Sequence, residues 1–382
     1  MSFVKVQVME RCISGIACVL FSLSIQAQSV TTTKRIDTGA DFLLIAPDAR
    51  SGAMGEVGAA TSPDVNSAHW NPAKLAFTPD SCSVALSYSP WLHNLASDMY
   101  LAYMSAHYRI DNRNTAGLSF RYFTAGDIEL REGPDDVPGT FTPNEFAIDG
   151  SFARKFGERF SLGSNIRFVY SNLSNGVLLQ GQRTDAGTAL AADVSAYYHQ
   201  PANFWGRDGR IAFGASITNI GNKIGYSGNG EKLFLPTNLR LGTAATLFDG
   251  PGEFTFALDL NKLLVPSPPV RDPDGNIIQG SDPDKSVPAA IFGSFADAPG
   301  GFSEELKEIA WSVGMEYIYD KQFALRTGYF YENPDKGDRR YLTLGGGVRY
   351  RRFNLDFSYL IASQQRSPLA NTLRFTFTYN IK

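Results

Sequence analysis

The final stretch of the chain, Leu373-Arg-Phe-Thr-Phe-Thr-Tyr-Asn-Ile-Lys382, alternates strictly between apolar and polar side chains. Its Leu, Phe, Tyr and Ile residues fall on one face of an extended chain, and its Arg, Thr, Asn and Lys residues fall on the other. A period of two is typical of a β-strand with one apolar and one polar face. Residues 353–361 repeat the pattern, and Arg351 with Arg352 is predicted to form a tight turn.

Working outward from this stretch, the same period predicts fourteen strands. Fourteen is an even number, as a single-chain bacterial barrel requires. The predicted strands cover residues 84–89, 99–110, 115–123, 145–156, 160–171, 188–199, 210–220, 237–248, 253–264, 309–319, 323–331, 341–350, 353–363 and 372–381.

Short and long connections alternate between these strands. Turns such as 157–159 and 351–352 are short and a medium one lies near 200–209, whereas loops such as 265–308 are long. Short turns on one rim and long loops on the other are typical of outer-membrane barrels, whose short rim faces the periplasm. We therefore predict an all-β, 14-stranded antiparallel outer-membrane β-barrel with extracellular loops and periplasmic termini.

Charged residues within the predicted strands fall on the face opposite the Leu, Phe and Tyr side chains. A lipid-facing Arg or Lys at mid-depth costs about 2–4 kcal/mol, so these residues should line the lumen, with Arg beside Asp. They are Arg121, Asp149, Arg167, Asp193, Arg240, Asp259, Glu316, Arg326, Arg349, Asp356 and Arg374.

Composition excludes several other classes. The 382 residues carry a formal charge of −3 and no basic block, which argues against a nucleic-acid partner. With 13% aromatic and 19% charged residues, the chain is not disordered. After residue 27 no uncharged apolar run reaches 18 residues, which excludes a transmembrane helix. A large soluble β-sandwich is the alternative fold, but it would not explain the alternating loop lengths.

The N-terminal part divides into two segments. Residues 1–27 are predicted to be a signal peptide, because Lys5 and Arg11 flank an apolar stretch that ends near Ala27; acylation at Cys18 is a less favoured alternative. Residues 28–83 lack strand alternation but contain apolar clusters. A fourteen-strand lumen is too wide for side chains alone to fill, so we predict that residues 28–83 form a plug inside a barrel of residues 84–382.

The plug contains the Trp70-Asn71-Pro72-Ala73 motif. An Asn-Pro-Ala triplet that ends a plug ahead of fourteen strands resembles the FadL family of outer-membrane transporters of hydrophobic compounds. The stretches 46–64 and 69–74, together with 88–92 and 118–123, resemble more closely the FadL-like PorV family of the type IX secretion system of Bacteroidetes. This second likeness extends from about residue 41 to the C-terminus.

The PorV resemblance implies a shuttle in the outer membrane. It implies binding of secreted cargo proteins by their C-terminal signal domain as they leave the translocon barrel, and delivery to a sortase-like attachment complex at the cell surface. Two alternatives stay open. One is a FadL-type transporter that carries a hydrophobic compound, which the charged lumen disfavours, and the other is a purely structural barrel subunit.

Apolar side chains on the predicted outer loops are the candidates for cargo or partner binding, because exposed Trp, Phe and Leu residues favour contact with a partner. Trp91 is the strongest candidate, since its loop is too short to bury it easily. Packing of the loops on one another and on the plug is the alternative. The candidates are Trp91, Leu92, Leu95, Leu178, Leu179 and Phe234, and the loop 265–308 adds Phe292, Phe295 and Phe302.

Signals for catalysis are weak, so no enzyme activity, cofactor or metal is predicted. The four histidines have no metal-ligand spacing. Asp272, Asp274 and Asn276 are spaced as in a calcium loop, but the Gly is misplaced and no Glu closes the site, which favours a flexible acidic loop. Residues 303–309 are predicted to start a short helix, with Glu304 and Glu305 near its N-terminus.

Overall fold

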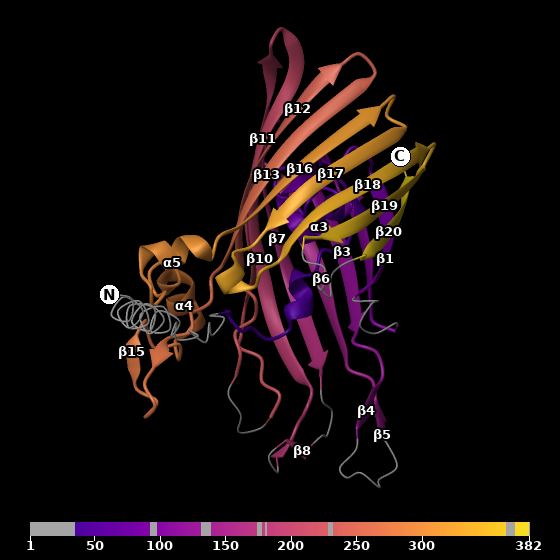
Figure 1. The fold of residues 1–382 in the computed structure, drawn as a ribbon. Coiled ribbons are helices and arrows are strands. Elements are labelled where there is room, and N and C mark those ends of the chain that lie inside the picture. Colours follow the sequence, from indigo (N-terminus) through magenta and orange to yellow (C-terminus); the bar gives the residue numbers. More distant parts are fainter. Residues whose placement is uncertain are drawn as a thin grey trace, which may run out of the picture. The chain divides into compact units, whose positions relative to one another are not determined.

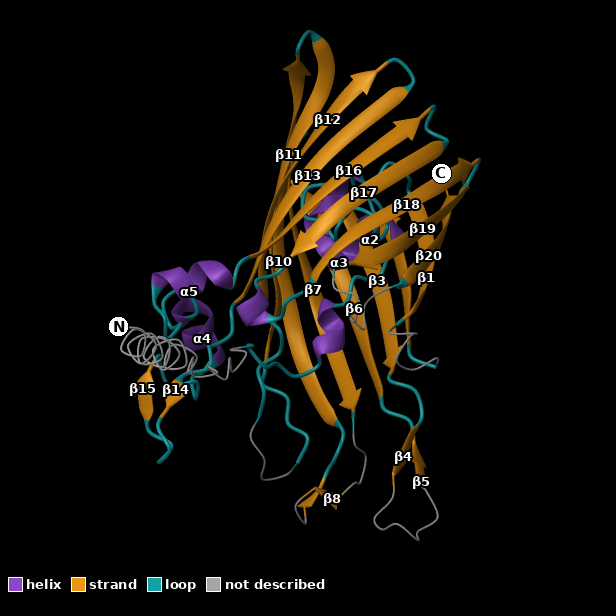
Figure 2. Ribbon diagram, viewed as in Figure 1, coloured by secondary structure: helices purple, strands orange, loops and turns teal. Residues whose placement is uncertain are grey.

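Fourteen strands form one closed antiparallel barrel (Figures 1 and 2). The computed structural model describes residues 35–91, 98–130, 139–173, 178–179, 182–227, 232–363 and 371–381, so the predicted signal peptide lies outside the described residues. The barrel strands are β1 (Cys82–Pro90), β2 (Tyr100–Arg109), β3 (Asn114–Thr124), β6 (Asn144–Lys155), β7 (Phe160–Asn172), β10 (Gly187–Phe204), β11 (Arg207–Gly221), β12 (Asn238–Asp249), β13 (Gly252–Leu263), β16 (Ala310–Tyr319), β17 (Phe323–Tyr331), β18 (Arg340–Tyr350), β19 (Phe353–Ala362) and β20 (Leu373–Ile381).

The first and last strands close the barrel, because β1 pairs with β20 and places Cys82 opposite Ile381. Closure gives every strand two hydrogen-bonded neighbours, as a sheet in lipid requires. The short turns and the C-terminal strand end lie on one rim, at the top of Figure 1, and the long loops lie on the other. These are called the short-turn rim and the long-loop rim below.

The predicted strands agree with the observed ones within a few residues, and two boundaries need correction. The first strand begins at Cys82 rather than at residue 84. The medium connection predicted near 200–209 is a two-residue turn, because β10 and β11 continue to Phe204 and Arg207. Trp205 and Gly206 form this turn with φ values of 53° and 82°, and positive φ at both positions matches the twist of a tight hairpin.

The predicted strand phase is confirmed. On β20, Phe375 and Phe377 are 44% and 46% exposed, whereas Arg374 is 1% exposed. The predicted Arg–Asp pairing inside the lumen is confirmed as well: Arg167 pairs with Asp149 and, at 3.1 Å, with Asp193. The barrel therefore presents an apolar exterior and a charged interior, as a strand in contact with lipid requires.

Aromatic side chains form a ladder on the outer wall next to the long-loop rim. Tyr100 lies 5.6 Å from Tyr88 and 6.1 Å from Tyr122 between ring centroids, and Trp311 stacks on Tyr331 at 5.1 Å. Amphipathic rings of this kind are enriched where a barrel wall meets the headgroup region.

Residues 35–81, called the plug segment below, precede β1 and pack against the lumen-facing side chains. Their short helices are η1 (Asp41–Leu44), α2 (Ala49–Gly52), α3 (Ser67–Trp70) and η2 (Pro72–Phe77), and Figure 2 shows α2 and α3 within the ring of strands. Among the described residues, no helix is long and apolar enough to cross a membrane.

The long-loop rim carries the remaining elements. Small hairpins are formed by β4 (Ile128–Leu130) with β5 (Gly139–Phe141) and by β8 (Leu178–Leu179) with β9 (Gln182–Arg183). Residues 264–309, called the loop unit below, contain β14 (Val270–Arg271), β15 (Ile277–Gln279), α4 (Val287–Gly293) and α5 (Phe302–Lys307), and η3 (Pro334–Lys336) lies in the next loop. The helix expected at 303–309 is thus confirmed as α5.

Candidate functional site

Arg50 on α2 is the main ionic link between the plug segment and the barrel wall. Its guanidinium contacts the Glu316 carboxylate of β16 twice, at 3.0 Å through Nε and 2.7 Å through Nη2. Its Nη1 donates to Asp64 at 2.8 Å. Although burial opposes the charged form, these carboxylates raise the pKa of Arg50 well above its ordinary value. Glu316 also accepts from Arg326 at 2.7 Å, so one carboxylate joins two arginines.

Asp48 holds the plug segment together internally. It is the N-cap of α2, where its side chain accepts from the Ser51 amide at 2.9 Å. Its other carboxylate oxygen accepts from the Trp70 indole nitrogen at 2.6 Å, which connects α2 with the end of α3. Burial and the nearby charge of Asp64 raise the pKa of Asp48.

The Trp70-Asn71-Pro72-Ala73 motif lies in the barrel interior and anchors the plug segment to two strands. Asn71 caps η2 and donates to the carbonyl oxygens of Ala59 at 2.9 Å and Ala196 of β10 at 3.0 Å. The Ala73 amide donates to Ser195 of β10 at 3.0 Å, and its carbonyl accepts from Ser161 of β7 at 2.7 Å. Pro72 fits the first turn of η2 because it needs no amide partner there.

Glycines in the wall allow the plug backbone to approach the strands closely. A Cβ on Gly214 of β11 would lie 2.0 Å from the carbonyl oxygen of Ala59. A Cβ on Gly328 of β17 would lie 2.1 Å from the carbonyl carbon of Met54. Both separations are far shorter than van der Waals contact, so any larger residue would displace the plug segment.

The lumen differs between its two ends. Near the long-loop rim, Phe42 and Leu43 of η1 are 2% and 3% exposed and pack in an apolar cluster with wall residues such as Leu101 and Val169. Arg121 donates to the Leu43 carbonyl at 2.8 Å and contacts His69 at 2.5 Å. The plug segment therefore fills the long-loop end with apolar side chains and the middle of the lumen with ion pairs.

The loop residues predicted as a binding surface are only partly described, and Trp91 is not exposed as expected. Trp91 is half-buried, packs against the apolar cluster and carries the Arg374 guanidinium over its ring at 5.8 Å. Trp91 thus packs on the apolar cluster rather than pointing into solvent. Phe234 is also half-buried, with the Lys223 ammonium 4.3 Å from its ring centroid.

The other predicted loop residues cannot be placed. Leu92 and Leu95 lie outside the described residues. Leu178 and Leu179 form the two-residue strand β8, but their side chains are outside the described part of the structure.

Large apolar side chains are exposed instead on the loop unit. Phe292 at the end of α4 and Phe302 at the start of α5 are 81% and 77% exposed. Phe295 and Leu306 are each about half exposed. Sequence reasoning identified the three phenylalanines as members of an outer loop but missed Leu306. Several large exposed apolar side chains in one loop unit favour contact with another molecule.

A buried ionic network fastens the loop unit to the barrel. Lys262 of β13 contacts Glu305 at 2.9 Å and Glu308 at 2.7 Å, and Lys336 of η3 contacts Glu304 at 2.7 Å and Glu308 at 2.9 Å. Glu308 thus joins two lysines that belong to different parts of the rim. The network holds α5 in a fixed position while its apolar side chains stay exposed.

Acid should loosen the loop unit. Burial opposes ionisation of Glu308, but hydrogen bonds from Lys262, Ser267 and Lys336 outweigh it and lower its pKa below the ordinary 4.5. A carboxylate with a depressed folded-state pKa stabilises the fold above its unfolded pKa, and this stabilisation is lost as pH falls through the folded value. We expect the protection factors of amides in residues 264–309, which correct for the slower intrinsic exchange in acid, to fall below pH 4.5. Replacing Glu308 by Gln should make the exchange of these amides fast at neutral pH, and an unchanged rate would contradict the role of the network.

Together, the closed sheet, the apolar exterior and the filled lumen define the class of protein, an outer-membrane β-barrel of fourteen strands with a segment of its own chain packed inside. The family model for "Type IX secretion system protein PorV" matches residues 28–270, which is more than half of the chain. The chain belongs to this family.

Solved structures share the barrel fold. The TodX deltaS2S3 mutant, a monoaromatic hydrocarbon channel, gives a TM-score of 0.51 at 14% identity, covering 87% of this chain and 99% of that one. The toluene transporter TodX of Pseudomonas putida gives 0.48 at 12% identity over 86% and 95%. A Pseudomonas aeruginosa FadL homologue gives 0.43 at 12% identity over 88% and 100%. Identities this low show the fold alone, and no curated protein matches the chain.

Proposed function

We propose that this barrel is the cargo-handling component of a type IX secretion system. It receives secreted proteins by their C-terminal signal domain as they leave the translocon barrel, and passes them to a sortase-like attachment complex at the cell surface. In this proposal the long-loop rim faces outward, and the short-turn rim and the termini face the periplasm. Membership of the PorV family supports the assignment to type IX secretion.

The exposed apolar surface of the loop unit is the observation that carries the proposal. Single exposed apolar residues are common on proteins, but Phe292, Phe295, Phe302 and Leu306 all belong to one unit that a buried ionic network holds in place. Rigid aromatic side chains lose little conformational freedom on binding, and they dominate the energy of protein interfaces. The proposed role needs binding and release of a protein, which such a surface performs without chemistry.

The FadL-type alternative has less support in this chain. A conduit for a hydrophobic compound needs an open path from the outside into the lumen. Here Phe42 and Leu43 fill the long-loop end of the lumen, and the buried layer of ion pairs around Arg50 and Glu316 lies behind them. A hydrophobic compound would have to cross that charged layer at a cost in desolvation.

Cargo capture tests the proposal. The double replacement of Phe292 and Phe302 by Ser should lower the amount of secreted protein that co-purifies with the barrel by roughly tenfold or more, because truncating an interface aromatic typically costs about 2 kcal/mol. Replacement of Trp205 by Ser is the matched control, since Trp205 is 94% exposed but lies on the opposite rim. Equal recovery from the double variant and the wild type, with both barrels folded, would refute the proposed surface.

A further inference from the structure

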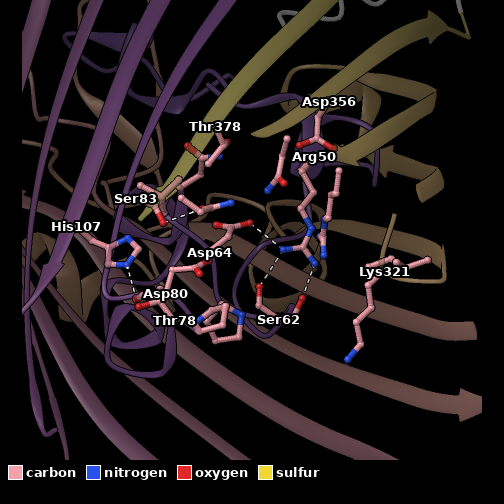
Figure 3. Close-up of a pocket in the computed structure, with 18 of the residues that line it drawn as sticks. Arg50, Ser62, Asp64, Thr78, Asp80, Ser83, His107, Lys321, Asp356 and Thr378 are labelled. Carbon is pink, nitrogen blue, oxygen red and sulfur yellow. Dashed lines mark hydrogen bonds and ion pairs between the residues drawn. The ribbon is translucent and has the colours of Figure 1, made fainter. Parts of the chain in front are cut away.

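A cavity of about 460 Å³ opens at the short-turn end of the lumen (Figure 3). Plug residues 62–66 and 77–80 form part of its lining, and strands and turns from both sides of the barrel complete it. We call it the vestibule. It is separate from the loop unit and from the proposed cargo surface, and it borders the plug anchor at Arg50 and Asp64.

Positive charge is in excess around the vestibule. Five basic side chains line it that make no hydrogen bond or ion pair with a carboxylate in the described part of the chain: Arg210, Lys321, Arg349, Arg351 and Arg352. Two of the four lining carboxylates are already engaged, because Asp64 pairs with Arg50 at 2.8 Å and Asp356 pairs with Arg326 at 2.7 Å. Among the described residues that line the vestibule, this leaves Asp80 and Glu253 to balance the five cations.

The middle of the lumen is organised differently. There Arg50, Arg167, Arg240 and Arg326 each have a carboxylate within 4 Å, so these four charges are locally neutralised. Arg210 and Arg349 are half-buried in the vestibule, where protein walls of low dielectric constant strengthen the field felt by an entering anion. Lys321, Arg351 and Arg352 are exposed at the turns around its mouth, and Arg351 lies 5.2 Å from the ring centroid of Tyr350. Bringing like charges together lowers stability unless a counter-charge binds.

We propose that the vestibule binds a small anionic ligand that carries two or more phosphate or carboxylate groups. Its volume lies in the range of small-molecule sites. Guanidinium groups such as those of Arg210 and Arg349 suit such ligands because their planar donors match both kinds of oxyanion in pairs. Ser62, Thr378 and Asn354 line the same space and can donate further hydrogen bonds. A ligand held here would rest against the plug segment at Ser62, and the site is independent of cargo binding.

Titration of citrate and of tripolyphosphate into the purified full-length barrel at low ionic strength tests the proposal. We expect saturable binding of one ligand per barrel, weakened at least tenfold when Arg210 and Arg349 are both replaced by Gln. Arg113→Gln with Arg159→Gln is the matched control, because it removes the same charge from exposed short-turn positions that do not line the vestibule. The control should change affinity less than twofold, and equal weakening by both double variants would overturn the site.

A second variant keeps the test decisive if the arginine variant folds poorly. Replacing Glu253 by Gln removes one of the two unengaged carboxylates and should tighten citrate binding severalfold. Unchanged or weaker binding in a folded Glu253→Gln barrel would contradict the inference, as would the lack of saturable binding to the wild type.

The source of the anion can be distinguished by the lipid around the barrel. Citrate binding should be compared in nanodiscs of phosphatidylcholine alone and of phosphatidylcholine with cardiolipin, whose headgroup carries two phosphates. Loss of citrate binding only when cardiolipin is present identifies a lipid headgroup as the occupant, whereas equal binding in both identifies a soluble periplasmic anion. Failure of citrate to bind in either membrane overturns the site.

Discussion

Replacing Glu316 by Gln should lower the free energy of unfolding of the barrel by about 3–5 kcal/mol, because it leaves buried arginines without their counter-charge. The Glu316 carboxylate contacts Arg50 at 2.7 and 3.0 Å and Arg326 at 2.7 Å, and its side chain is 1% exposed. Gln has nearly the same shape but cannot neutralise either guanidinium, and its amide would face donors on both sides. Reversible urea unfolding in lipid vesicles, followed by tryptophan fluorescence, measures the change.

Glu158→Gln is the matched control for this measurement. Glu158 is exposed in the short turn between β6 and β7, does not line the vestibule and has no ion pair among the described residues. Its replacement should change the free energy of unfolding by less than about 0.5 kcal/mol, as expected away from buried networks. A Glu316→Gln variant as stable as the control would show that the plug segment is not held by its ionic link to the wall.

Replacing Gly328 by Val should force the plug segment out of its position and open the lumen. The added Cβ alone would lie 2.1 Å from the Met54 carbonyl carbon and 2.2 Å from the Gly55 amide nitrogen, so the rigid plug backbone must move. Nearby, Thr343 accepts from the Gly55 amide at 2.8 Å and donates to the Ala53 carbonyl at 2.9 Å, and this attachment would be lost with the displacement. Single-channel recording in planar bilayers should detect a conductance that the wild type lacks.

Gly150→Val controls for the loss of glycine itself. Gly150 lies in β6, and a Cβ there meets nothing within 4 Å. This variant should remain closed and insert normally. Conductance in both variants, or in neither, would contradict the assignment of residues 35–81 to a close-fitting plug.

Much of the barrel could be predicted from sequence because the two faces of each strand lie in different environments. Lipid on one side and the packed lumen on the other impose the alternation seen from Leu373 to Ile381, and a lipid-facing charge is so costly that Arg374 must point inward. The Asn-Pro-Ala motif was also recognisable, since a cap followed by Pro is a local signal for the start of a helical turn.

The binding surfaces depend on contacts that no local pattern encodes. Arg50 and Glu316 are separated by 266 positions in the chain, so their pairing follows from how the plug segment enters the barrel. Trp91 was expected to be exposed because its loop is short, but its burial depends on Arg374 and on plug residues far away in sequence. The vestibule likewise gathers side chains from several strands and turns, and Arg351 and Arg352 alone resemble ordinary turn residues.

Photo-crosslinking in intact cells tests the central proposal most directly. A photoreactive amino acid at position 292 or 302 should form adducts with secreted proteins that carry a C-terminal signal domain, whereas the same group at position 205, on the short-turn rim, should form none. Adducts restricted to position 205, or an equal yield from both rims, would contradict cargo binding at the loop unit.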